Sequence, residues 1–171
     1  MIITKPEHIE YAEFYSPYIK AVQQNDLLDA LHTNKADYDS FFESVDLSKG
    51  DYRYADGKWT LKEVLLHVCD AERIFAYRAL RFARNDHAEL HGFVENEYVP
   101  YSNAAARTLF NIHEEFGSIR AATLSLYKSF TNDMLMRKGI ASCNIVTVRA
   151  LGFIIVGHAN HHLNVIKERY L

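Results

Sequence analysis

An apolar stripe with helical spacing near the end of the chain constrains the fold more than any other feature. Between about Thr147 and Arg169, the residues on this stripe recur at intervals of three and four: Val148, Leu151, Ile155, His158, His162 and Val165. At about 100° per residue, such positions share one face of an α-helix. The pattern therefore predicts a long helix whose buried face carries two histidines.

Three earlier segments show the same apolar period and are predicted to be helices. They cover about residues 26–45, 60–84 and 102–130. Only 7 glycines and 3 prolines occur in 171 residues, and so few breakers favour long helices over a β fold with many turns. Four long amphipathic helices predict an all-α protein, a four-helix bundle.

Capping residues stand at the expected helix starts. Thr60 is followed three residues later by Glu63, which is the spacing of a capping box. Asn25 or Asp26 is the expected N-cap of the helix at 26–45, and Ser102 that of the helix at 102–130.

The segments outside these helices define the predicted domain organisation. Residues 1–24, where Pro6 and Pro17 bracket an aromatic-rich stretch, are expected to form a short helical extension. Residues 25–171 then form the bundle as a single domain. The connections at 46–58, 85–101 and 131–146 are long enough for a crossover, and the last could hold a short helical turn.

Charge and composition exclude several classes of function. The net charge of −3 argues against a nucleic-acid-binding surface, which is normally basic. Cys69 and Cys143 are far apart, so a disulfide framework is not expected and a reducing compartment is favoured. The chain has no run of 18 apolar residues and no signal-peptide pattern, so we expect a cytoplasmic protein without a membrane partner.

The histidines of the apolar stripes could hold a metal ion. His158 and His162 are four residues apart, which stacks two side chains on one helix face. His67 lies on the apolar stripe of the helix at 60–84. Three imidazoles from two helices leave a coordination position open, as in catalytic sites. Imidazole suits zinc, nickel, copper or iron, so the ligands alone do not select the metal.

Other polar residues have weaker functional signals. His161 could replace His162 as a ligand, but it lies at the edge of the stripe. Asp70 lies one turn beyond His67, where it could orient a ligand or act as a base, although an ion-paired carboxylate explains it as well. Glu95 and Asn96 are further catalytic candidates, because their loop could reach the mouth of the bundle.

Two arginines on the helix at 60–84 leave a choice open. Arg73 and Arg78 could bind an anionic substrate, but ion pairs between helices explain them equally well. Two surface histidines, likewise, are the simplest alternative to a metal site for His158 and His162.

Three segments resemble the DinB superfamily, the group of DinB/YfiT-like metalloenzymes. They are residues 59–73 (WTLKEVLLHVCDAER), residues 92–98 (GFVENEY) and residues 147–162, which end in GHANHH. The resemblance implies a four-helix bundle with up-down-down-up connections. It also implies a divalent metal ion, zinc or nickel, held by His67, His158 and His162. Some branches of the superfamily act on low-molecular-weight thiols such as bacillithiol, mycothiol or glutathione.

Two functional hypotheses follow from these observations. The first is a metal-dependent enzyme, a thiol-dependent S-transferase or a hydrolase, whose partners are a small-molecule substrate and a low-molecular-weight thiol. The second is a non-catalytic helical protein that binds a small molecule or dimerises, with a structural metal. We expect a homodimer in either case, with the aromatic-rich residues 1–24 as a candidate contact surface.

Overall fold

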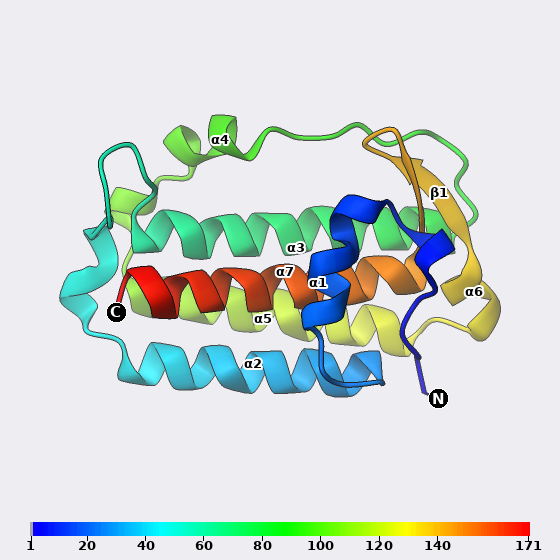
Figure 1. Ribbon diagram of the computed structural model, residues 1–171, viewed down its shortest axis with the longest axis horizontal. Helices are drawn as coiled ribbons and strands as arrows, with labels where there is room; N and C mark the ends of the chain where they lie inside the picture. Colours follow the sequence, from blue (N-terminus) through cyan, green and yellow to red (C-terminus); the bar gives the residue numbers. More distant parts are fainter. Residues whose placement is uncertain (1) are drawn as a thin grey trace.

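Four long helices lie side by side and form the body of the molecule (Figure 1). The computed structural model describes residues 2–171. The bundle consists of α2 (Leu27–Ser44), α3 (Leu61–Ala83), α5 (Leu109–Lys128) and α7 (Val148–Arg169). The predicted all-α fold and four-helix bundle are therefore confirmed.

The direction of the helices makes the connections unusual. In Figure 1, α2 and α7 run from right to left, whereas α3 and α5 run from left to right. Because the consecutive helices α3 and α5 are parallel, residues 84–108 must return along the whole length of the bundle. This is the predicted up-down-down-up order.

Capping side chains begin several of the helices at the predicted positions. The hydroxyl of Thr60 accepts a hydrogen bond from the Glu63 N–H (3.2 Å), and the Glu63 carboxylate accepts one from the Thr60 N–H (2.6 Å). The carboxylate of Asp26 caps α2 by accepting from the Leu28 N–H. Each cap satisfies backbone donors that the first helical turn leaves free.

The crossover segment delays the start of the third long helix. It contains α4 (Glu95–Tyr98) and two 3₁₀ turns, η4 (Val99–Tyr101) and η5 (Ala104–Ala106). The expected start at Ser102 is wrong, because Asn103 takes a left-handed conformation (φ 57°) that no helix can continue through. Thr108 is the actual N-cap of α5, and its side chain accepts from the Asn111 N–H.

The connection between α5 and α7 contains a β-hairpin that the sequence analysis did not predict. The expected helical turn is present as α6 (Asn132–Met136). After it, β1 (Lys138–Ala141) pairs antiparallel with β2 (Asn144–Thr147). Leu90 of the crossover segment joins this hairpin through backbone hydrogen bonds to Ile140 and Ser142 (both 2.9 Å).

The remaining short elements cover the ends and one side of the bundle. They are η1 (His8–Glu10), η2 (Glu13–Tyr15), α1 (Ser16–Ala21) and η3 (Leu47–Asp51). Helix α1 packs against α7 (Figure 1). The division into residues 1–24 and 25–171 stays a prediction.

Helix α7 is the most enclosed element of the bundle. Every residue from Val148 to Ala159 except Arg149 is buried. The helix contacts α1, α2 and α3, which explains why its sequence is apolar over three turns. Across residues 2–171, no helix combines the length and the hydropathy needed to cross a membrane.

Candidate metal centre

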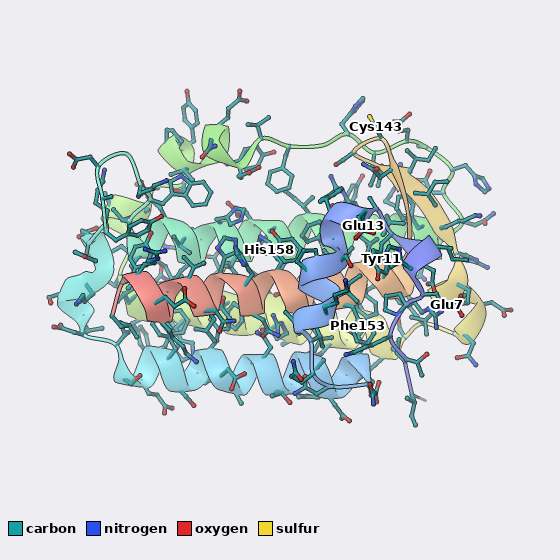
Figure 2. All side chains as sticks on the ribbon, in the orientation of Figure 1. Glu7, Tyr11, Glu13, Cys143, Phe153 and His158 are labelled. Atoms are coloured by element: carbon teal, nitrogen blue, oxygen red, sulfur yellow. The ribbon has the colours of Figure 1, made fainter. Side chains whose placement is uncertain are left out.

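Three histidines from two helices converge in the interior of the bundle. The Nε2 atom of His158 lies 3.0 Å from Nε2 of His67 on α3 and 3.1 Å from Nε2 of His162. One ring nitrogen from each residue lies within 4.8 Å of the other two. Figure 2 places His158 between α3 and α7, near α1. The structure thus brings together the three histidines that the sequence singled out.

Hydrogen bonds to α2 fix the turn of α7 that carries two of these histidines. The Tyr38 hydroxyl donates to the Ala159 carbonyl (2.9 Å), and the Asn34 side chain donates to Asn160 (2.7 Å). Both acceptors lie between His158 and His162 in sequence. These bonds hold the helix in a rotation that points both imidazoles at α3.

Burial keeps the histidine cluster uncharged at neutral pH. Desolvation lowers the pKa of His67, and the negative charge of Glu95 only partly opposes this effect. Desolvation, followed by repulsion from neighbouring histidines, lowers the pKa of His162 to about 3 and that of His158 well below 6.5. A neutral imidazole is the form that binds a metal ion.

The spacing of the three nitrogens suits a single metal ion. Metal–imidazole bonds of about 2.0–2.1 Å separate two tetrahedral ligands by about 3.3 Å. Two of the nitrogen separations are 3.0 and 3.1 Å, close to this value, and the third lies within 4.8 Å. Three neutral nitrogens facing one another cannot all find hydrogen-bond partners among themselves, because each offers one donor or one acceptor. The donor set therefore fits a divalent cation.

A cavity of about 350 Å³ opens onto the cluster. Its walls are mainly aromatic. The ring centroid of Tyr18 lies 5.7 Å from that of His158, Phe75 lies 6.0 Å from His158, and Trp59 lies 5.0 Å from His67. The size is that of a site for a small molecule.

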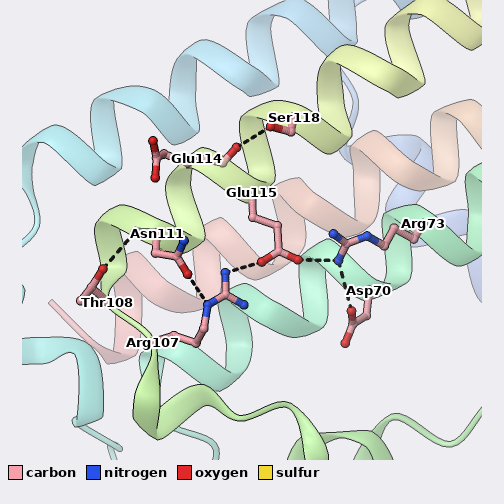
Figure 3. A network of polar contacts seen from close by, with 8 residues as sticks. All are labelled: Asp70, Arg73, Arg107, Thr108, Asn111, Glu114, Glu115 and Ser118. Atoms are coloured by element: carbon pink, nitrogen blue, oxygen red, sulfur yellow. Dashed lines mark hydrogen bonds and ion pairs between the residues drawn. The ribbon is translucent and has the colours of Figure 1, made fainter.

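The carboxylate candidates have different surroundings. Glu95 of α4 lines the cavity together with the three histidines. Asp70 takes part in an ion-pair network along the surface, where it lies 3.6 Å from Arg73, and Arg73 in turn pairs with Glu115 of α5 (2.5 Å) (Figure 3). Burial raises the pKa of Asp70, and Arg73 opposes this rise.

The remaining candidates lie beside the cluster. Asn96 lines a neighbouring cavity of about 490 Å³, which also contacts Trp59, His161 and His162. His161 is exposed and points its ring toward Tyr18, with 5.5 Å between centroids. The predicted position of His161 at the edge of the stripe agrees with this exposure.

The sequence analysis missed the aromatic walls of the cavity. Tyr15 and Tyr18 come from the N-terminal segment, which was assigned only to a helical extension and a dimer contact. The run of aromatic residues at 11–18 was a signal for a buried surface, but the sequence did not show what it would cover. Phe75 lies two turns from His67 on α3, and that spacing could have identified it.

Neither cysteine lies in the cavity. Cys69 is buried, and desolvation raises the pKa of its thiol well above the ordinary value. Cys143 is exposed at the tip of the β-hairpin (Figure 2). The chain therefore places no thiolate of its own beside the histidine cluster.

Comparison with known proteins assigns the family. A family model described as the DinB superfamily matches residues 30–166, which is most of the chain. The protein belongs to the DinB superfamily. The comparison with curated proteins gives no match.

One solved structure of similar fold is YfiT from Bacillus subtilis. The two chains superpose with a TM-score of 0.74 over 96% of this chain and 90% of YfiT, at 18% sequence identity. YfiT is described as a probable metal-dependent hydrolase with an unusual four-helix bundle topology. At this level of identity the likeness establishes the fold, including the order of its helices.

Proposed function

We propose that this protein is a metal-dependent hydrolase of small molecules, with the ion held by His67, His158 and His162. The observation that carries the proposal is the convergence of three histidine ring nitrogens beside an accessible cavity. The description of the similarly folded YfiT as a probable metal-dependent hydrolase supports the same reaction class.

Zinc and nickel are the metals that we propose for this site. Either ion would act as a Lewis acid and lower the pKa of a bound water or thiol. Three protein ligands and an adjoining cavity favour an open catalytic site over a closed structural one, which normally has four protein ligands. The predicted homodimer, cytoplasmic location and small-molecule partner remain predictions.

The protein's own residues would bind the substrate and move a proton. Glu95 is the one carboxylate among the residues that line the cavity, and we assign it the role of proton acceptor. Tyr18, Phe75 and Trp59 would hold the apolar part of a substrate against the cluster and exclude bulk water.

A thiol-dependent S-transferase is the second candidate, and one observation favours it. The neighbouring cavity of about 490 Å³ shares Trp59, His161 and His162 with the first, so two spaces meet at the histidine cluster. Such an arrangement suits two substrates. A hydrolase would turn over its substrate without added thiol, whereas a transferase would require one.

Metal analysis of purified protein tests the proposal. After loading with zinc or nickel, the wild type should retain one ion per chain. His67→Ala, His158→Ala and His162→Ala should each lose it, because two imidazoles remain. His161→Ala is the matched control, since it removes an adjacent imidazole outside the cluster, and should keep the ion. Unchanged metal content in all three cluster variants would refute the proposal.

Thermal unfolding separates a catalytic metal from a structural one. Removal of a structural ion by chelator should abolish most of the fold, because its binding energy is folding energy. We expect the chelated protein to stay folded, since the bundle has an extensive apolar core of its own. Complete unfolding on chelation would favour the structural alternative.

A further inference from the structure

Arg78 of α3 is a buried cation in the wall of the cavity. Only 3% of its surface is exposed, and it lines the same cavity as the three histidines. No Asp or Glu of residues 2–171 forms an ion pair with it. A buried charge without a counter-ion is costly, so the absence of a protein carboxylate needs an explanation.

A second buried arginine shows how the same fold neutralises a guanidinium when the role is structural. Arg120 of α5 is fully buried, and its Nε and Nη2 atoms donate to the Glu72 carboxylate at 2.9–3.2 Å. Its Nη1 donates to the Asn34 side chain (2.7 Å) and to the Leu31 carbonyl (3.0 Å). Arg78 has no equivalent of Glu72.

The hydrogen bonds of Arg78 leave part of its guanidinium free. Its Nη2 donates to the His91 carbonyl and to the Ser142 hydroxyl, both at 3.0 Å. A guanidinium has five N–H donors. The Tyr15 hydroxyl, which lines the same cavity, also hydrogen-bonds the guanidinium, so these contacts together leave some of the five donors without a protein acceptor. Among residues 2–171, the one fully enclosed side-chain polar atom without a partner is Oγ of Ser16. The remaining N–H groups of Arg78 are therefore not sealed off, and they open onto the cavity that Arg78 lines.

Phe75 lies near both Arg78 and the histidine cluster. Its ring centroid is 6.0 Å from that of His158 and 5.7 Å from the guanidinium carbon of Arg78. The guanidinium carbon therefore lies within about 12 Å of the His158 ring, the sum of these two separations. A single small molecule can span this distance.

We propose that Arg78 binds the anionic group of the substrate, which is a small organic carboxylate or phosphoryl compound with an apolar body. The oxyanion accepts hydrogen bonds from the guanidinium N–H groups that His91, Ser142 and Tyr15 leave free, and the positive charge strengthens these bonds. The body lies against Phe75, and the bond to be cleaved lies over the histidine cluster. This assignment of substrate class rests on the proposed function.

A purely structural role is the alternative for Arg78. Its bonds to His91 and Ser142 join the crossover segment to the β-hairpin, so its loss should also lower stability. The test therefore measures ligand binding separately from unfolding. It uses metal-free protein, because a metal ion would itself attract anions.

The experiment measures binding of three aromatic probes to chelator-treated protein at pH 8, where an ordinary imidazole is neutral. The probes are benzoate, phenylphosphonate and the neutral benzamide. The single Trp59 lines the cavity and reports binding by fluorescence, with calorimetry as a second readout. Arg78→Gln removes the charge, and Arg78→Lys keeps the charge but removes the planar guanidinium with its several donors. Arg81→Gln is the matched control, since it removes a positive charge from the same helix outside the cavity.

We expect at least one anion to bind the wild type tenfold or more tightly than benzamide. Arg78→Gln should lower the affinity for that anion at least tenfold, and Arg78→Lys should lower it less. Arg81→Gln should change this affinity less than twofold. A preference for benzoate identifies the carboxylate class, and one for phenylphosphonate the phosphoryl class. Anion binding no tighter than benzamide binding, or unchanged in folded Arg78→Gln, overturns the proposal. If Arg78→Gln does not fold, the wild-type comparison of anion with benzamide decides.

The result does not depend on the metal proposal. Anion binding with no metal uptake would refute the proposed function and leave the role of Arg78 standing. Metal uptake without anion preference would support the metal site and refute the role proposed for Arg78.

Discussion

The main-chain carbonyl of Tyr18 lies directly against the backbone of Gly157. A Cβ atom at Gly157 would overlap the carbonyl carbon and oxygen of Tyr18, so α1 and α7 cross with no side chain between them. The same close approach brings the Tyr18 ring beside His158, the next residue of α7, in an edge-to-face arrangement with 5.7 Å between ring centroids. The glycine therefore determines both where α1 lies and how one wall of the cavity forms.

Gly157→Ala should displace α1 from α7. The added methyl meets rigid backbone and not the end of a flexible side chain, so we expect a loss of about 1–3 kcal/mol, the range for overpacking. Chemical denaturation measures the loss. Hydrogen exchange of residues 16–21 should rise more than that of α2 or α5.

Gly117→Ala is the matched control in helix α5. Its added methyl would meet nothing within 4 Å, and alanine favours a helix over glycine by about 1 kcal/mol. This variant should be as stable as the wild type or more stable. Destabilisation of both variants to the same degree would show that the contact with Tyr18 is not the cause.

Regular patterns in the sequence predicted the regular parts of the fold. The period of three and four, the capping box at Thr60 and Glu63, and the histidines on two apolar stripes each depend on neighbours within one helix. The β-hairpin escaped prediction because its strands have four residues each, and its turn uses Ser142 and Cys143 at positive φ where glycine or asparagine would be expected.

Contacts between distant segments were not predictable from these patterns. Nothing in the sequence near Tyr18 indicates that its ring would lie over His158, 140 positions later. The same holds for Arg78, for which the sequence allowed either an ion pair or an anion site. Only the structure gives Arg120 a carboxylate partner and leaves Arg78 without one.

The buried pair of Arg120 and Glu72 gives a second prediction. Arg120→Met should destabilise the protein by about 3–5 kcal/mol, because it leaves the Glu72 carboxylate buried without a partner. The double variant Arg120→Met/Glu72→Met should recover much of this loss, since apolar residues can replace a buried ion pair. Urea denaturation of the single and double variants measures the coupling.

Arg120 also donates to Asn34, which in turn bonds to Asn160 of α7. Recovery of stability in the double variant without recovery of metal affinity would show that this chain of hydrogen bonds positions the histidines. If the single variant is as stable as the wild type, the pair contributes nothing and the prediction fails.

The contacts of Glu10 with the start of α7 predict that the stability of the fold depends on pH. Glu10 accepts hydrogen bonds from Arg149 and from Thr147, the N-cap of α7. Burial alone would raise the pKa of Glu10, but these bonds and the Arg149 charge outweigh it and hold the pKa below 4.5. The folded state thus binds the proton less readily than the unfolded state. The contacts of Glu10 therefore stabilise the fold above pH 4.5, and this contribution is lost as the pH falls through the lowered pKa of Glu10.

Glu10→Gln should therefore cost about 1–3 kcal/mol at pH 7 and progressively less below pH 4. Denaturation curves at several pH values measure the difference from the wild type. Glu13→Gln serves as the control, because Glu13 is exposed and its ion pair with His8 lies at the surface. A constant difference between Glu10→Gln and the wild type from pH 7 to pH 3 would contradict the assignment.

The two acidic candidates near the cluster make different predictions for catalysis. Glu95 faces the cavity, whereas Asp70 is engaged with Arg73 in the surface network (Figure 3). Glu95→Gln should lower kcat about 100-fold or more, the usual effect of losing a general base. Asp70→Asn should change kcat less than threefold.

A screen of metal-loaded protein against activated esters, amides and phosphoesters provides the substrate for this comparison. Both variants should keep the full metal content, because neither residue belongs to the histidine cluster. A large loss of kcat in Asp70→Asn with none in Glu95→Gln would reverse the two roles and assign the proton transfer to Asp70.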